Sequence, residues 1–226
     1  MLIAIDTATQ YLGLALYHED ALIAEQTWRT GNKHNLILAS TIQHMLHICD
    51  VNPDDLSMIA VAKGPGSYTG LRIGVALAKG LASVNQLPLI GINTLDIIAA
   101  GQPFANTKHR LLCILPAGRG RVIVGEYQVK KGRWIALNEP EITNWDDLLT
   151  GLDAPSYYFA GELDSDGLAA IAAFKHADVN LTVIDAAQRL RRPGILAREA
   201  WTLYHTGKAS DFIPAKLAPV YMNTPG

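Results

Sequence analysis

The stretch KGPGSYTGLRIG, from Lys63 to Gly74, lies between a short apolar segment and a longer amphipathic one. Residues 58–62 predict a buried strand, and residues from about 69 to 85 predict a helix. Open α/β sheets place their ligands at turns of this kind, where a strand passes into a helix. The stretch therefore indicates an α/β fold and marks the functional centre of the chain.

The glycines of this stretch predict a tight turn that another group can approach closely. Gly64 and Gly66 tolerate positive φ angles, and Ser67 or Thr69 can cap the following helix, whose N–H groups favour an anion. The spacing fits neither a Walker A loop, because position 69 is Thr, nor GxGxxG, because the third glycine is Gly70. A capped turn and a phosphate or nucleotide contact through Gly64, Gly66 and Ser67 both remain open.

Small residues repeat every four positions along the predicted helix, at Gly70, Gly74, Ala78 and Ala82. A glycine inside a helix costs about 1 kcal/mol relative to alanine, so Gly74 and Gly80 suggest that another backbone packs very close. That backbone belongs either to the helix predicted at residues 33–50 or to a helix of a partner subunit.

On either side of this stretch, the first hundred residues predict one lobe with a known order of strands and helices. Apolar runs separated by polar turns predict three meandering strands, at residues 2–6, 12–17 and 22–28. A helix at residues 33–50, with Asn32 as its expected cap, precedes the central stretch, and a strand at 89–92 and a helix from Thr94 follow it. The order βββαβαβα is the plan of an actin-like (ribonuclease-H-like, ASKHA) lobe, whereas a doubly wound sheet alternates from its start.

Polar residues 101–108 predict a boundary to a second, reduced α/β lobe. Its expected strands lie at residues 110–115, 122–130, 134–139, 157–160 and 181–184. Its expected helices begin at Thr143 and cover residues 165–175. An apolar helix from Ile195 to His205 then returns to the first lobe. We expect residues 1–101 with about 193–226 in one lobe, and about 102–192 in the other.

The bulk composition suits a globular protein of low charge. The chain has 226 residues, of which 49% are apolar and 18% charged, and its formal net charge is −2. This charge argues against autonomous nucleic-acid binding, which needs a basic face. Basic clusters occur at Arg119/Arg121 and at Arg189/Arg191/Arg192. A solvated loop is the simpler interpretation of each, and contact with nucleic acid inside a larger complex stays open.

The cysteines and the apolar runs indicate a soluble cytoplasmic protein without membrane segments. Cys49 and Cys113 stand in apolar segments without CxxC spacing, as buried thiols of a reducing compartment do. Asp6 interrupts the first apolar run, which has no basic leader, so we expect no signal peptide.

Few side chains in the sequence are candidates for catalysis or for binding a metal or phosphate. Asp6, Thr7 and Thr9 gather at the first strand-turn-strand, where actin-like ATPases hold metal and phosphate, but we favour bonds to the turn backbone. His44 and His47 lie three apart on a helix with no third ligand nearby in the sequence. The sequence predicts no catalytic residue and no metal site.

At KGPGSYTGLRIG the chain resembles the TsaB (YeaZ) family, bacterial partner subunits in tRNA threonylcarbamoyladenosine biosynthesis. The family signature is close to GPGSFTGLRIG, and Tyr68 stands here for the phenylalanine. The opening MLIAIDTAT, His34 before a helix, PLIGINTLDIIA at residues 88–99, and the ending at Ala218–Tyr221 extend the resemblance. The second lobe matches only loosely.

The resemblance implies a non-catalytic scaffold that acts with the catalytic subunit TsaD and the ATPase TsaE. Together they threonylcarbamoylate adenosine 37 of tRNAs that read codons beginning with A. TsaD binds its metal through two histidines, and the matching positions here hold Thr94 and Ile98. The partners would then bind ATP or ADP and the metal, and tRNA would be reached only through the complex. A homodimer of the isolated chain stays open.

The resemblance also implies a partner surface on the helices predicted around 33–50 and 69–85. The residues expected on it are His34, Leu38, Gly70, Gly74, Ala78 and Ala82. A second hypothesis is an ATP-dependent enzyme of the sugar-kinase kind, which needs an acid facing Asp6 and an adenosine loop, for which Gly161-Glu162 is the only candidate. A third hypothesis is a peptidase, but the sequence offers neither a catalytic nucleophile nor a set of metal ligands for one.

Overall fold

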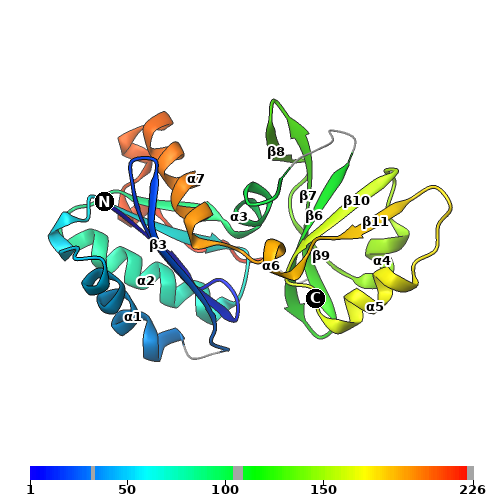
Figure 1. Ribbon diagram of the computed structural model, residues 1–226, viewed down its shortest axis with the longest axis horizontal. Helices are drawn as coiled ribbons and strands as arrows, with labels where there is room; N and C mark the ends of the chain where they lie inside the picture. Colours follow the sequence, from blue (N-terminus) through cyan, green and yellow to red (C-terminus); the bar gives the residue numbers. More distant parts are fainter. Residues whose placement is uncertain (32–33, 104–108, 223–226) are drawn as a thin grey trace. The chain divides into compact units, whose positions relative to one another are not determined.

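The computed structural model describes residues 1–31, 34–103 and 109–222, and the chain divides into two compact lobes (Figure 1). Lobe one comprises Met1–Ile97 and Arg192–Tyr221, and lobe two comprises Ile98–Arg191 together with Met222. The first boundary lies after Ile97 rather than after residue 101, and the Ile98 side chain packs beside Gly161 of lobe two.

Lobe one contains a five-stranded sheet in the order β3-β2-β1-β4-β5. Its strands are β1 (Leu2–Asp6), β2 (Tyr11–His18), β3 (Ala21–Arg29), β4 (Met58–Gly64) and β5 (Leu89–Asn93). The three meandering strands pair antiparallel, and β1, β4 and β5 pair parallel. This topology is the actin-like plan that the element order predicts.

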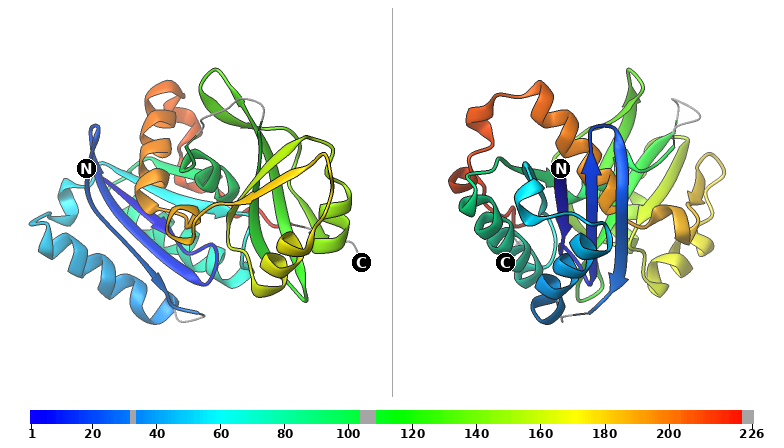
Figure 2. Two further views of the ribbon diagram at one scale, coloured as in Figure 1. Left: turned by 45° about the vertical axis from the view of Figure 1, so that its right-hand side comes forward. Right: turned by 60° about the vertical axis from the view of Figure 1, so that its left-hand side comes forward.

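Helices cover both faces of this sheet. Successive side chains of β1 point to opposite faces, so β1 contributes to an apolar cluster on each face. Ile3 and Ile5 pack in one apolar cluster with α1 (His34–Ile48) and α2 (Tyr68–Val84). Leu2 and Ala4 pack in the other cluster with α7 (Pro193–Thr206), the predicted returning helix. Figure 2 shows α7 and the α1–α2 pair on opposite sides of the sheet. A short helix, α3 (Thr94–Ala100), follows β5.

Lobe two repeats the same strand plan. Its sheet has the order β11-β10-β6-β7-β8, with β9 pairing beside β7. The strands are β6 (Arg110–Gly118), β7 (Arg121–Lys130), β8 (Arg133–Ala136), β9 (Glu141–Asn144), β10 (Ser156–Gly161) and β11 (Asn180–Val183). Strand β6 pairs antiparallel with β7 and parallel with β10, as β1 does with β2 and β4. The two lobes therefore share a topology that direct comparison of their sequences does not show.

The helices of lobe two are short, which agrees with a reduced lobe. They are α4 (Trp145–Thr150), α5 (Ser165–Ala173) and α6 (Ala186–Arg189). The predicted helix start at Thr143 is wrong, because Thr143 lies in strand β9 and pairs with Val122 of β7. The helix begins two residues later, where the Asn144 side chain accepts a hydrogen bond from the Asp147 N–H at 2.9 Å.

None of the helices in the described parts of the chain combines the length and apolar character needed to cross a membrane.

Candidate functional site

The glycine loop between β4 and α2 packs against two other segments of lobe one. Gly64 has a φ of +115°, and a Cβ there would collide with the Val220 carbonyl. The Val220 N–H donates to the Lys63 carbonyl at 2.7 Å. A Cβ on Gly66 would collide with the Ala8 carbonyl. The close approach that the sequence predicts is therefore made by the chain's own backbone.

Ser67 caps α2, as predicted. Its Oγ accepts a hydrogen bond from the Gly70 N–H at 3.3 Å, and its own N–H donates to the Ala8 carbonyl at 2.6 Å. The loop is thus a capped strand-to-helix turn whose glycines make room for Ala8 and Val220.

The polar side chains of the β1–β2 turn bond within the same lobe. Asp6, Thr7 and Thr9 are buried, with exposed fractions of 3%, 0% and 6%. An Asp6 carboxylate oxygen accepts from the Ala8 N–H at 2.9 Å, and the Thr7 hydroxyl donates to the Gly70 carbonyl at 2.7 Å. The Thr9 hydroxyl accepts from a backbone N–H two residues on, at 3.4 Å. The turn-backbone interpretation therefore holds for Asp6 and Thr9, whereas Thr7 bonds the first turn of α2.

The structure corrects the predicted partner surface on α2. Ala78 and Ala82 have no exposed surface, and a Cβ on Gly70 or Gly74 would collide with the Thr7 carbonyl or hydroxyl oxygen. The close neighbour of Gly70 and Gly74 is therefore the β1–β2 turn, and the buried side chains of Ala78 and Ala82 present nothing to another chain. Leu38 on α1 is also buried, at 2% exposed, and the His34 side chain lies outside the described residues.

A different face of α2 reaches solvent. The exposed residues at four-residue spacing, here called the outer line, are Tyr68, Arg72, Ala76, Gly80 and Val84. A Cβ on Gly80 would meet nothing within 4 Å, and Val84 is 80% exposed. On the neighbouring helix α1, Leu36 and Ile48 are 72% and 62% exposed. Sequence periodicity did not indicate this face, because only Ala76 and Gly80 on it are small and the longer run of small residues passes through Gly74.

The arginine cluster before α7 forms ion pairs inside the chain. Arg191 donates to Glu162 at 2.6 Å, with side chains only 2% and 9% exposed. Arg192 pairs with Glu25 of β3. The prediction of a solvated loop is therefore wrong for Arg191. The same ion pair occupies Gly161-Glu162, the candidate adenosine loop.

The two positions that the resemblance matches to metal ligands are covered by the fold. Thr94 has no exposed surface, and Ile98 is 1% exposed. Within residues 1–31, 34–103 and 109–222, no three His, Cys, Asp or Glu side chains gather as a metal site requires.

Lobe two holds a polar cavity of about 290 Å³ that the sequence did not reveal. Its carboxylates are Glu126, Glu139, Glu141, Asp147 and Asp153. They come from separate elements, so no local motif connects them.

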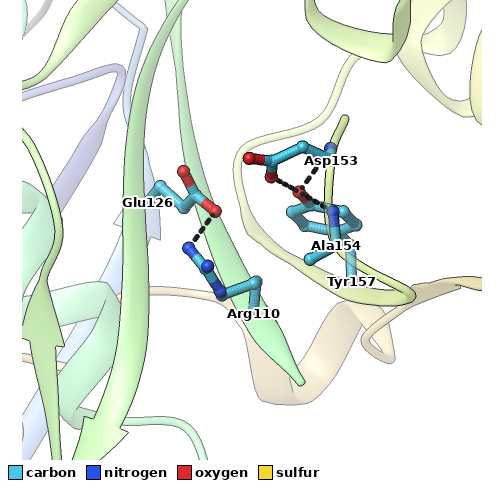
Figure 3. A network of polar contacts seen from close by, with 5 residues as sticks. All are labelled: Arg110, Glu126, Asp153, Ala154 and Tyr157. Carbon is cyan, nitrogen blue, oxygen red and sulfur yellow. Dashed lines mark hydrogen bonds and ion pairs between the residues drawn. The ribbon is translucent and has the colours of Figure 1, made fainter. Parts of the chain in front are cut away.

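Figure 3 shows the polar contacts beside this cavity. Arg110 donates to Glu126 at 2.9 Å, and the Tyr157 hydroxyl donates to Asp153 at 2.9 Å. That hydroxyl accepts from the N–H groups of Asp153 and Ala154 at 3.1 and 3.0 Å. Burial raises the pKa of Glu126, although the Arg110 charge acts in the opposite direction. Burial likewise raises the pKa of Tyr157.

Known proteins match both the sequence and the fold. Residues 28–186 match the family model of TsaD, the tRNA N6-adenosine threonylcarbamoyltransferase. The chain is 39% identical over 160 residues to the tRNA threonylcarbamoyladenosine biosynthesis protein TsaB of Bacillus subtilis, covering 68% of each chain. It is 34% identical over 149 residues to the Escherichia coli protein of that name, covering 63% of this chain and 64% of that one.

The chain belongs to the TsaB/YeaZ family. A solved structure of YeaZ from Pseudomonas aeruginosa superposes with a TM-score of 0.75 at 22% identity, covering 98% of this chain and 99% of that one. At this identity the likeness shows the fold, and it spans both lobes. The TsaD model match adds that TsaB and TsaD sequences are related across much of the chain.

In this TsaB-family chain, the signature therefore has a structural role that can be stated residue by residue. Gly64 and Gly66 admit Val220 and Ala8, and Gly70 and Gly74 admit Thr7. The signature contacts two distant segments of lobe one, the β1–β2 turn and the segment after α7, and its contacts with the turn set how α2 lies on the sheet.

Proposed function

We propose that the chain is a non-catalytic subunit for threonylcarbamoylation of adenosine 37 in tRNA, acting in the cytoplasm with a TsaD-like catalytic subunit and a TsaE-like ATPase. The observation that carries the proposal is the 39% identity to the TsaB protein of Bacillus subtilis, whose name assigns it to tRNA threonylcarbamoyladenosine biosynthesis. ATP or ADP and the metal belong to the partner subunits, and tRNA is reached through the complex.

The side chains at the candidate catalytic positions support a non-catalytic role. Thr94 and Ile98 are buried, and an isoleucine side chain offers no metal ligand. The Asp6 carboxylate bonds the turn backbone, and Glu162 is paired with Arg191. The Asp6 and Glu162 carboxylates therefore stabilise the fold through bonds within the chain.

The outer faces of α1 and α2 support a partner-docking role. Ala76 and Gly80 leave a low centre on α2 where a second helix can approach closely, and helix separation depends on the side chains at the contact. Leu36 and Ile48 of α1 and Val84 of α2 add exposed apolar surface on the same two helices. A TsaD-like partner matches the same family model, so it presents a related helix pair for near-symmetric packing.

A binding titration with matched tryptophan variants tests this surface. Ala76→Trp places a bulky ring at the centre of the outer line, and Ala169→Trp does the same on the exposed face of α5. We expect Ala76→Trp to weaken binding to the TsaD homologue at least about tenfold, since overpacked contacts cost about 1–3 kcal/mol. Ala169→Trp should bind as the wild type does. Equal affinities of both variants would remove α2 from the docking surface.

Reconstitution tests the function itself. Purified chain is combined with the TsaD and TsaE homologues of its organism, and threonylcarbamoyladenosine formation in tRNA is measured with and without it. Omission should abolish product formation, and full product without the chain would contradict the proposal. ATP turnover by the isolated chain that Asp6→Ala abolishes would instead support the sugar-kinase-like alternative.

A further inference from the structure

Three side chains contact one another at the first turns of α2, with the two tyrosine rings tilted by 38°, and are here called the Tyr–Arg stack. The ring centroids of Tyr68 and Tyr221 lie 4.9 Å apart. The Arg72 guanidinium lies 5.2 Å from the Tyr68 ring centroid and donates to the Tyr68 hydroxyl at 2.8 Å. The Val220 N–H bond to the Lys63 carbonyl holds the segment that carries Tyr221. The stack is therefore ordered by contacts within lobe one.

The Tyr–Arg stack is exposed although it is ordered. Tyr68 is 59% exposed and Tyr221 is 41% exposed, and Arg72 also faces solvent. Tyrosine and arginine are the residue types that dominate the energy of protein interfaces. Because the rings and the guanidinium already hold one another, a partner that binds them loses little side-chain entropy.

The segment that carries Tyr68 and Arg72 contains basic residues and no acidic ones. Between Asp55 and Asp96 the sequence contains no Asp or Glu, but it contains Lys63, Arg72 and Lys79. In the described parts of the chain, no carboxylate forms an ion pair with Arg72. The guanidinium thus offers N–H donors to an anionic group from outside, in a chain whose net charge is negative.

The position of the stack indicates which anionic group it meets. Tyr68 and Arg72 begin the outer line that continues through Ala76 and Gly80, so a protein lying along α2 also covers the stack. We infer that the Tyr–Arg stack anchors the docked TsaD-like subunit by receiving an Asp or Glu carboxylate of that partner on Arg72. Apolar atoms next to that carboxylate pack on the two rings. The inference rests on the proposed function and adds the chemistry of the contact.

The test is calorimetric titration of the full-length chain with the purified TsaD homologue at several salt concentrations. We expect Arg72→Gln to weaken binding about tenfold or more and to flatten its salt dependence. Arg72→Lys should keep the salt dependence but recover only part of the affinity, because it lacks the planar guanidinium. Tyr221→Ala should weaken binding with the salt dependence retained. Lys208→Gln, an exposed charge change beyond α7, is the control and should have no effect.

The outcomes separate this inference from the proposed function. Wild-type affinity of Arg72→Gln and Tyr221→Ala, together with weak binding of Ala76→Trp, would overturn the inference and leave the docking face in place. Absence of binding by the wild-type chain would overturn both. If the variants bind the TsaD homologue normally but their complex binds tRNA more weakly, the stack contacts RNA and the inference is wrong. Thermal unfolding of each variant, expected to match the wild type, shows that a binding loss is not a folding loss.

Discussion

Gly74 and Gly80 stand on the same helix in opposite surroundings. A Cβ on Gly74 would collide with the Thr7 hydroxyl oxygen, whereas one on Gly80 would meet open space. We therefore expect Gly74→Ala to destabilise the chain by about 1–3 kcal/mol through overpacking. Gly80→Ala should stabilise it by about 0.5–1 kcal/mol through helix propensity and a less flexible unfolded chain. Urea denaturation measures both, and changes of the same sign would contradict this assignment of the two faces.

The Glu126 carboxyl makes the stability of the chain depend on pH. Burial raises its pKa from the ordinary value of 4.5, so the folded state binds more protons than the unfolded state just above that pH. Its contribution to stability is thus present below pH 4.5 and falls as the pH rises through the folded pKa. Glu126→Gln, which can still accept a hydrogen bond from Arg110, should be more stable than the wild type at pH 7. The difference should shrink toward pH 4.

Urea denaturation across a pH series measures this effect. Glu139→Gln, an exchange at an exposed residue of the same cavity, is the control. A Glu126→Gln protein that is less stable than the wild type at pH 7 would show that the ion pair with Arg110 outweighs the cost of burial.

At the scale of elements, the segment after α7 completes lobe one beside the end of β4. The Val220 N–H bonds the Lys63 carbonyl, and the Val220 carbonyl occupies the space that Gly64 leaves. Val220→Pro removes the donor, so we expect a loss of about 0.5–1.5 kcal/mol. Val220→Ala trims a side chain that is 40% exposed and keeps the donor, so it should cost less. Thermal unfolding compares the two, and equal losses would rule out the backbone bond as the cause.

At the scale of the whole molecule, the two lobes depend differently on chain continuity. Lobe two has its own apolar cluster within a continuous segment, but lobe one needs α7 from the distant end of the chain. Leu196, Ala197 and Ala200 of α7 are completely buried in the core of lobe one. A chain cut after Arg191 should therefore keep lobe two folded and lose lobe one.

Amide NMR spectra distinguish these outcomes. Dispersed signals should remain for residues of lobe two, and a fragment of residues 98–191 should reproduce them. Dispersed signals from β1 and β2 in the shortened chain would show that the sheet holds without α7.

Local patterns of the sequence determined the elements of lobe one and their order, since side-chain periodicity and capping act over a few residues. They also predicted the glycine turn, its Ser67 cap and the family resemblance carried by the signature. The order of elements then limits the sheet to few topologies, so the actin-like plan followed.

Only the tertiary structure decided which surface of α2 is free. The stripe through Gly74 and the outer line through Gly80 both contain small residues, and periodicity does not say which of the two meets the sheet. The contacts of Thr7 with Gly70 and Gly74 show that the stripe through Gly74 faces the sheet. Thr7, Ala8 and Val220 lie far from the signature in the sequence, and only the folded chain brings them against it. The carboxylate cavity of lobe two was hidden for the same reason, because its members lie on separate elements. The sequence thus determined the plan of the chain, and the long-range packing of lobe one decided that the signature glycines serve the core while the outer line stays exposed.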